Sequence, residues 1–223
     1  MLFVIDKVLT QEELAHTRGK LATARFGDGR VTAGELAAQA KHNLQLPEDG
    51  EDARAMSHLV VNALKGNGEF VSAALPRAVY PPLFNRYLPG MNFGAHMDNA
   101  IRFGAVTLRA DVSGTLFLSD PEAYQGGALV IEDTYGAQRV KLSAGSLVLY
   151  PSTSLHRVDP VTQGTRDVAV FWVQSLVRED SQRSLLYSLD QAIQSLRARA
   201  PESPEIPPLA ACYHNLLRLW AQL

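Results

Sequence analysis

The chain has 223 residues, of which 46% are hydrophobic and 20% are charged, and its formal net charge is −2. These values are typical of an ordinary globular protein and exclude the fibrous and disordered classes. A nearly balanced charge also lacks the basic surface that neutralises nucleic-acid phosphates, so we expect no nucleic-acid partner.

The sequence carries no pattern that would direct it to a membrane or to an oxidising compartment. The short apolar run 2–5 has no basic flank and ends at Asp6, so it does not resemble a signal peptide. No run of about eighteen apolar residues is present. The single cysteine, Cys212, cannot form an intramolecular disulfide. We therefore expect a cytoplasmic protein with no membrane association.

The first third of the sequence has a helical pattern. Segments rich in Ala and Leu, the first of them preceded by a capping residue at Thr10, predict helices over 11–23, 32–46 and 52–64. We expect residues 1–78 to form an N-terminal helical support for the rest of the chain.

From Val79 onward, short runs of β-branched and aromatic residues replace the helical pattern. They predict strands over 83–87, 115–118, 128–132, 138–142, 146–150 and 167–173. Turns that contain glycine, such as 124–127 and 144–145, separate several of them. Many short strands with such turns favour an antiparallel sandwich or barrel, of which the jelly roll is one form. We predict an α+β protein whose core spans residues 79–177.

Residues 178–223 are predicted to form a C-terminal helical extension. Leucines at helical spacing predict a helix over 181–200, four prolines between 201 and 208 then interrupt the chain, and a last helix is predicted over 209–223. The last helix has an apolar stripe that consists of Leu209, Leu216, Leu219 and Trp220. This stripe either packs onto its own domain or joins subunits into a homo-oligomer through the C-terminal helices.

A histidine and an aspartate two residues apart, His96 and Asp98, lie near the start of the predicted core. On a strand, residues i and i+2 face the same side, so the imidazole and the carboxylate can point at one ion. His156 follows 58 residues after Asp98 (156 − 98), and an antiparallel sheet that folds back can bring it beside them. Two histidines and a carboxylate are the facial triad of non-haem Fe(II) oxygenases. The same set also suits catalytic zinc, which leaves a zinc hydrolase as an alternative.

Arg166 lies ten residues after His156 (166 − 156), at the start of an apolar strand. Strand alternation places it on one face with Val168, Val170 and Trp172. A guanidinium presents a planar fork of donors that matches a carboxylate, so Arg166 is suited to the distal carboxylate of 2-oxoglutarate. The alternative is a solvated arginine at a strand end. A zinc hydrolase would leave Arg166 without a role.

Longer motifs resemble the prolyl-4-hydroxylase-like branch of the 2-oxoglutarate dioxygenases. They are the run 85–98, the segments 124–131 and 144–152, and His156 with Arg166. Segments 98–102, 133–136 and 171–175 resemble more closely the bacterial PKHD-type hydroxylases, which include members associated with iron uptake. The resemblance spans nearly the whole chain and includes 32–34 and 43–46 near the N-terminus.

This resemblance implies a double-stranded β-helix core that binds Fe(II), uses 2-oxoglutarate as co-substrate and relies on L-ascorbate to keep the iron reduced. It implies that His96, Asp98 and His156 bind the metal and that Arg166 binds the 2-oxoglutarate carboxylate. Prolyl hydroxylases often have a tyrosine on a central strand that shares the 2-oxoglutarate carboxylate with the arginine. The corresponding run 115–118 has no hydroxyl group beyond its first residue, so Tyr87 is the candidate to assist Arg166. The implied reaction consumes O₂, releases succinate and CO₂, and hydroxylates an unidentified primary substrate.

Two further alternatives remain open. An AlkB-type oxidative demethylase has a similar run before its first histidine, but that group carries a second arginine where this sequence has Trp172. A non-catalytic jelly-roll protein that binds iron or a small acid would form no succinate. Asn99, Arg102 and Arg109 are close in sequence to the predicted ligands and are candidates for the substrate mouth.

Overall fold

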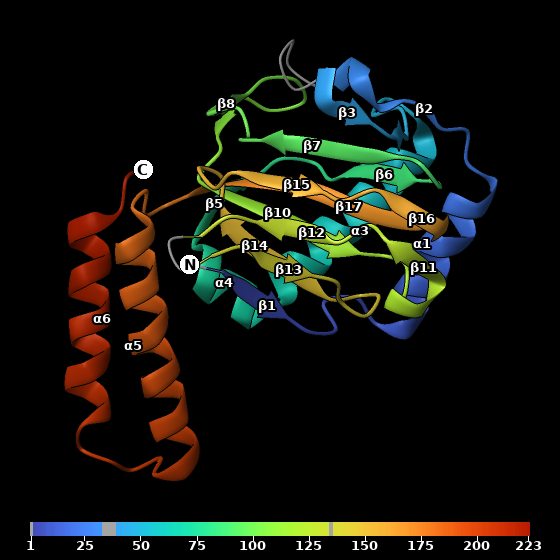
Figure 1. Cartoon of the computed structure of the whole chain (residues 1–223). Helices are drawn as coiled ribbons and strands as arrows, with labels where there is room; N and C mark the ends of the chain where they lie inside the picture. The colour runs from blue at the N-terminus through green and yellow to red at the C-terminus, as the bar shows by residue number, and fades with distance from the viewer. Residues whose placement is uncertain (1, 33–38, 134–135) are drawn as a thin grey trace.

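The computed structural model describes residues 2–32, 39–133 and 136–223. Two antiparallel sheets face each other, helices cover the outer face of the larger sheet, and a helical hairpin at the C-terminus extends away from the body (Figure 1). This is the α+β jelly-roll architecture that the sequence predicted, with helices at both ends of the chain.

The sheets differ in size and in their neighbours. The larger sheet has the order β1 (Phe3–Ile5), β14 (Leu147–Pro151), β10 (Val112–Phe117), β17 (Arg166–Ser175), β6 (Leu83–Tyr87), β4 (Leu44–Gln45) and β2 (Gly27–Asp28), and β5 (Pro76–Val79) also pairs with β17. The smaller sheet has the order β13 (Gln138–Val140), β12 (Leu129–Ile131), β15 (His156–Val158), β7 (Asn92–His96) and β3 (Lys41–His42). Two ribbons are formed by β8 (Ile101–Arg102) with β9 (Leu108–Arg109) and by β11 (Tyr124–Gly126) with β16 (Val161–Gly164).

The central strand β17 contributes to two separate cores. Its side chains at 169, 171 and 173 pack into the layer of helices α1 (Gln11–Thr23), α3 (Glu51–Gly66) and α4 (Gly68–Ala74). Val168, on the opposite face, packs between the two sheets with Phe117 and Leu129. Because successive side chains of a strand point to opposite faces, this register also directs Arg166 into the space between the sheets.

Local sequence signals account for the N-terminal helices. Helix α1 begins after Thr10, whose hydroxyl accepts from the Glu13 backbone N–H (3.2 Å) while the Glu13 carboxylate accepts from the Thr10 N–H (2.8 Å). This capping box satisfies two N–H groups that have no partner within the helix. The predicted helices over 11–23 and 52–64 are confirmed. Helix α4 was not predicted, although Asn67 caps it by accepting from the Phe70 N–H (2.9 Å).

The predicted helix over 32–46 is wrong at its C-terminal end, where Lys41–His42 and Leu44–Gln45 are strands. Residues 33–38 of that prediction lie outside the described residues. Strand β3 pairs with β7 in one sheet and β4 pairs with β6 in the other. These pairings satisfy the backbone and outweigh the intrinsic helix propensity of the segment.

The C-terminal hairpin consists of α5 (Asp180–Arg199) and α6 (Ile206–Trp220). Helix α6 begins three residues earlier than predicted (209 − 206), because Pro207 and Pro208 occupy its first turn, where no intrahelical N–H bond is lost. Leu216 and Trp220 pack against a buried cluster that consists of Leu75, Val177 and Leu186. Part of the apolar stripe therefore packs internally, whereas Leu219 is exposed, and subunit association through the hairpin stays a prediction.

Among the described residues, no helix combines the length and the apolar character needed to cross a bilayer.

We predict that the docking of the hairpin depends on Leu186, which is fully buried, and not on its neighbour Leu185, which is 59% exposed. Leu186→Ala should lower the free energy of unfolding by about 2–5 kcal/mol, because it leaves a cavity in a packed cluster. The matched change Leu185→Ala should alter it by less than about 0.5 kcal/mol. Urea unfolding followed by circular dichroism measures both, and equal effects would contradict the packing described.

Candidate functional site

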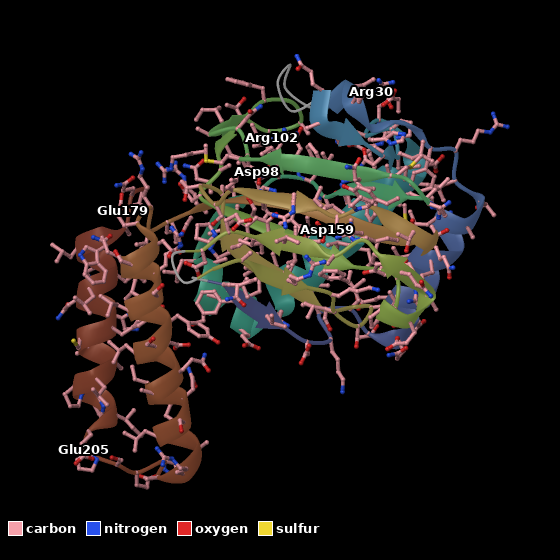
Figure 2. The ribbon with its side chains drawn as sticks, in the orientation of Figure 1. Arg30, Asp98, Arg102, Asp159, Glu179 and Glu205 are labelled. Carbon is pink, nitrogen blue, oxygen red and sulfur yellow. The ribbon has the colours of Figure 1, made fainter. Side chains whose placement is uncertain are left out.

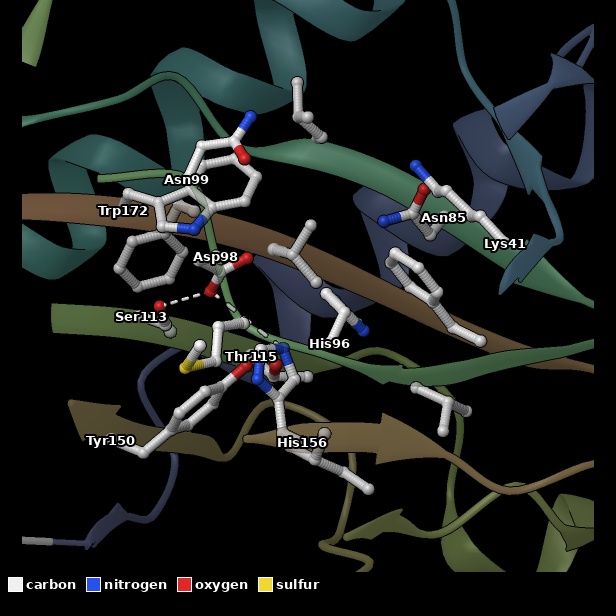
Figure 3. Close-up of a pocket in the computed structure, with 18 of the residues that line it drawn as sticks. Lys41, Asn85, His96, Asp98, Asn99, Ser113, Thr115, Tyr150, His156 and Trp172 are labelled. Atoms are coloured by element: carbon white, nitrogen blue, oxygen red, sulfur yellow. Dashed lines mark hydrogen bonds and ion pairs between the residues drawn. The ribbon is translucent and has the colours of Figure 1, made fainter. Parts of the chain in front are cut away.

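Two histidines and an aspartate meet between the sheets. Strand β7 ends at His96, β15 begins at His156, and the antiparallel register pairs these two residues directly. Their rings lie 4.3 Å apart, and Asp98 follows β7 by two residues, with its Oδ2 3.9 Å from His156 Nε2 (Figure 3). One ligand atom from each of the three residues lies within 4.8 Å of the others. Side chains 58 residues apart in the chain thus form one compact donor set.

Both imidazoles are oriented by the backbone. His96 Nδ1 lies 2.8 Å from the Gly94 carbonyl oxygen, and His156 Nδ1 lies 3.0 Å from the Ser154 carbonyl oxygen. A carbonyl oxygen only accepts, so each Nδ1 carries a proton, and in the neutral form of each ring the Nε2 lone pair is the one available to a metal. Burial, followed by the neighbouring His156, lowers the pKa of His96 to about 4, which keeps this imidazole neutral at pH 7. Neutral imidazole is the form that binds a metal.

The carboxylate of Asp98 accepts from one buried serine, which in turn contacts a second buried serine. Ser113 Oγ donates to Asp98 Oδ2 at 2.6 Å, and the Ser152 hydroxyl lies 2.8 Å from Ser113 Oγ. Ser113 lies on β10 of the larger sheet, and Ser152 directly follows β14 of the same sheet. The hydrogen bond from Ser113 therefore fixes Asp98 across the gap between the sheets. Two neutral imidazoles and one oriented carboxylate fit the donor set of a non-haem Fe(II) site that keeps open positions.

Arg166 is buried without a counter-charge. It is 1% exposed, and none of its three guanidinium nitrogens has a hydrogen-bond partner among the described residues. Its guanidinium carbon lies 5.0 Å from the Tyr87 ring and 5.5 Å from the Phe117 ring. An unpaired buried charge is costly, which indicates a position built for an anion. The solvated strand-end alternative for Arg166 is therefore wrong.

Tyr87 lies opposite Arg166 in the β6–β17 register, and burial raises the pKa of its phenol. On the other side, Gly127 has a φ of +60°, and a Cβ at this position would lie 3.1 Å from Arg166 Cδ. The glycine turn at 124–127 therefore lets the chain pass close to the arginine stem.

Two tyrosines near this site were missed by sequence reasoning. The buried Tyr150 ring lies 5.0 Å from the His156 ring and lines the same cavity. Burial raises the pKa of Tyr124, and the charge of Arg166 opposes that rise, which places this phenol close to the guanidinium. In the sequence both residues look like ordinary core aromatics. Only strand alternation from Val148, which packs between the sheets, could have placed Tyr150 on the same face.

One cavity joins these groups. It has an empty volume of about 780 Å³, including its open mouth, and it is lined by the histidine and aspartate triad, Tyr87, Tyr150 and Arg166. Asn99 and Arg102 also line it, as the sequence suggested for a substrate mouth. Arg109 is not among the lining residues and instead pairs with Asp111 at 2.6 Å.

Comparisons with known proteins agree with this geometry. Residues 82–174 match the family model of the 2OG-Fe(II) oxygenase superfamily, and residues 180–222 match the PKHD-type hydroxylase C-terminal domain. A PKHD-type hydroxylase of Xanthomonas campestris pv. campestris (strain B100) is 56% identical, with 100% of each chain covered. One of Stutzerimonas stutzeri (strain A1501) is 54% identical over the same full coverage.

The chain belongs to the PKHD-type hydroxylases. It is an Fe(II)- and 2-oxoglutarate-dependent oxygenase, which sets aside the zinc hydrolase and the non-catalytic binding protein. The 56% identity to a PKHD-type hydroxylase, which extends over the full length of both chains, also disfavours an AlkB-type demethylase. The fold agrees with a crystal structure of a Pseudomonas putida prolyl-4-hydroxylase, with a TM-score of 0.51 and 21% identity over 78% of this chain and 92% of that one.

We predict that Ser113 positions Asp98 for metal binding. Ser113→Ala should weaken the affinity for Fe(II) by about tenfold to a hundredfold, the loss typical of removing a hydrogen bond to a metal ligand. A matched control is Ser72→Ala, because Ser72 Oγ donates to the Asp190 carboxylate (2.7 Å) far from the site. Anaerobic competition titration with a coloured chelator measures both variants. Unchanged affinity in Ser113→Ala would show that the carboxylate needs no such support.

Proposed function

We propose that this PKHD-type hydroxylase inserts one oxygen atom into a C–H bond of a primary substrate, with Fe(II) bound by His96, Asp98 and His156 and 2-oxoglutarate bound by Arg166. The observation that carries the proposal is the pairing, in one cavity, of an open-faced donor set with a buried arginine that has no partner among the described residues.

Each of the three donors has a defined task. The Nε2 lone pairs of His96 and His156 bind the metal, while the backbone carbonyls of Gly94 and Ser154 hold the rings in place. Asp98 contributes one negative charge, and its bond from Ser113 limits the rotation of the carboxylate. Two neutral ligands and one carboxylate leave a ferrous site with a formal charge of +1, which favours an anionic co-substrate.

The two negative charges of 2-oxoglutarate match two positive positions in this part of the cavity, the ferrous site and the Arg166 guanidinium. The keto acid end of 2-oxoglutarate would face the metal held by His96, Asp98 and His156, and its distal carboxylate would accept from the Arg166 guanidinium. A planar guanidinium can donate to both oxygens of that carboxylate. Tyr87, whose ring lies beside the guanidinium, is proposed to limit its motion and to donate a further hydrogen bond.

Bound Fe(II) supplies the oxidative step, in which O₂ converts 2-oxoglutarate to succinate and CO₂, one oxygen atom enters succinate and the other enters the substrate as a hydroxyl group. The chain itself positions the reactants and limits side reactions. Aromatic and aliphatic side chains beside the ligands, among them Phe93, Tyr150 and Val158, limit the access of water. Ascorbate, as the reductant that restores Fe(II), is part of the same proposal.

Removing any one of the three proposed ligands should abolish the site. In His96→Ala, Asp98→Ala and His156→Ala, we expect the loss of the weak visible charge-transfer band that a keto acid chelated to Fe(II) gives under anaerobic conditions. Succinate release should fall with it, while circular dichroism stays native, because each change removes only a few atoms at a cavity wall. The control is the exposed His16→Ala. A variant that keeps the band and near-normal succinate release would remove that residue from the ligand set.

Arg166→Ala should weaken 2-oxoglutarate binding far more than Fe(II) binding. Removing one partner of a buried charge pair costs roughly 2–5 kcal/mol, which corresponds to roughly thirtyfold to a few thousandfold in affinity. Arg166→Lys keeps the charge but loses the planar fork, so it should recover only part of the loss.

The control for this titration is Arg139→Ala, because Arg139 forms an exposed pair with Asp159 and its side chain is 61% exposed. Isothermal titration of 2-oxoglutarate into anaerobic Fe(II)-loaded protein compares the three variants with the parent. If Arg166→Ala binds 2-oxoglutarate as tightly as Arg139→Ala does, Arg166 is not the anchor.

A further inference from the structure

The cavity extends beyond the proposed 2-oxoglutarate position toward a second group of polar side chains. Arg166 and Trp172 lie on the same face of β17, six residues apart (172 − 166), which is roughly 20 Å along a strand. Asp98 lies at the Trp172 end, because its partner Ser113 pairs with Trp172 in the β10–β17 register. The region around Trp172 is therefore the part of the cavity that 2-oxoglutarate leaves for the primary substrate.

Two hydrogen-bond donors in this region are buried and have no partner among the described residues. They are Arg102 Nε and Trp172 Nε1, and Trp172 as a whole is only 8% exposed. The Arg102 guanidinium stacks on the indole, with its central carbon 4.0 Å from the Trp172 ring and 5.1 Å from the Tyr80 ring. Stacking holds the guanidinium plane and leaves its N–H edge for an acceptor. Two buried donors without an acceptor indicate a ligand that supplies one.

A second basic group lines the same cavity. Lys41, on β3, is buried, its ammonium lies 5.6 Å from the Phe93 ring, and it donates to Gln45 Oε1 at 3.0 Å. Burial, followed by the charge of Arg102, lowers the pKa of Lys41 to about 8, while Glu48 and Asp98 raise it. Lys41 and Arg102 both line this cavity.

The charges in the cavity do not balance once the proposed reactants are counted. Its described lining residues include three basic side chains, Lys41, Arg102 and Arg166, and one acidic side chain, Asp98. Fe(II) with Asp98 carries +1 and Arg166 carries +1, which the two charges of 2-oxoglutarate cancel. The Arg102 charge remains beyond that balance, and Glu48, whose Oε2 accepts from the Tyr80 hydroxyl (3.2 Å), is not among the described lining residues.

The cavity lining also includes an exposed apolar side chain. Met97, which is 60% exposed, lines the cavity beside Asp98. Figure 2 labels Asp98 and Arg102 on the same side of the molecule.

We propose that the primary substrate is a small organic oxyanion whose carboxylate or phosphate group accepts from Arg102 and from the Trp172 indole N–H. Lys41 supplies a second positive charge, and the apolar body of the substrate lies against Met97. This inference rests on the proposed function, because it takes the Arg166 end as the 2-oxoglutarate position. Binding of the oxyanion at Arg102 and Trp172 sets which C–H bond lies nearest the metal.

The probe for the test is methylphosphonate, with its neutral dimethyl ester as the matched uncharged compound. The protein is the full chain, anaerobic and loaded with Fe(II) and stoichiometric 2-oxoglutarate, and its charge-transfer band is recorded first. Paramagnetic broadening of the ³¹P signal, referenced to protein loaded with Zn(II), reports whether the probe binds near the metal. We expect broadening for methylphosphonate and none above the reference for the ester.

Three substitutions test the donors. Arg102→Gln and Lys41→Met each remove a charge, and Trp172→Phe removes only the indole N–H. We expect Arg102→Gln to weaken methylphosphonate binding by about tenfold or more, because a hydrogen bond to a charged group is lost. The other two variants should weaken it severalfold, and Arg102→Lys should recover part of the loss. The controls are Arg77→Gln, Lys65→Met and Trp220→Phe, in which the exchanged side chains lie outside the cavity.

The outcomes separate the two proposals. If the band forms but methylphosphonate does not bind, or binds equally to all variants, the oxyanion site is overturned and the proposed function stands. Binding that survives all three substitutions would also indicate direct metal coordination by the probe. If no band forms, the proposed function fails, and the ³¹P titration of Zn(II)-loaded parent and Arg102→Gln protein still decides whether an oxyanion binds at Arg102.

Discussion

The pleat of β17 is the constraint on which the rest of the structure depends. This strand lies at the centre of the larger sheet, so its two faces contribute to two different interiors. Residues 169, 171 and 173 pack under the helices, whereas Arg166 and Trp172 line the cavity. A shift of one residue in the pairing with β6 and β10 would exchange these sets. Packing of the helical layer therefore also holds the chemistry of the cavity in register.

The cavity concentrates polar groups that the fold leaves without partners. Arg166, Arg102 and Trp172 each have buried donors with no acceptor among the described residues, and all three line one space. Such groups oppose folding, because they lose water without gaining a hydrogen bond. The apolar cores on both faces of the larger sheet offset this cost. Reactants that bring carboxylate or phosphate oxygens would supply the missing acceptors.

The two sheets divide the proposed work between them. The smaller sheet contributes both histidines through one antiparallel register, and the larger sheet contributes Arg166, Tyr87 and the serine that holds Asp98. The metal donors and the co-substrate anchor therefore come from opposite walls of a single cavity. The C-terminal hairpin docks through a separate cluster around Leu186.

By itself, the sequence singled out His96, Asp98, His156 and Arg166 from residue type and spacing, and the resemblance of its longer motifs to a known family implied the reaction class. The sequence also predicted six of the strands and most of the helices from local patterns, but not β7 or β15. It could not place Lys41, which the helical pattern of 32–46 concealed, or bring Arg102 onto Trp172 across 70 residues (172 − 102). Local propensity acts over a few residues, whereas strand pairing and burial join distant ones. Only the tertiary structure could therefore decide that two basic groups and an indole N–H share the cavity with the metal donors.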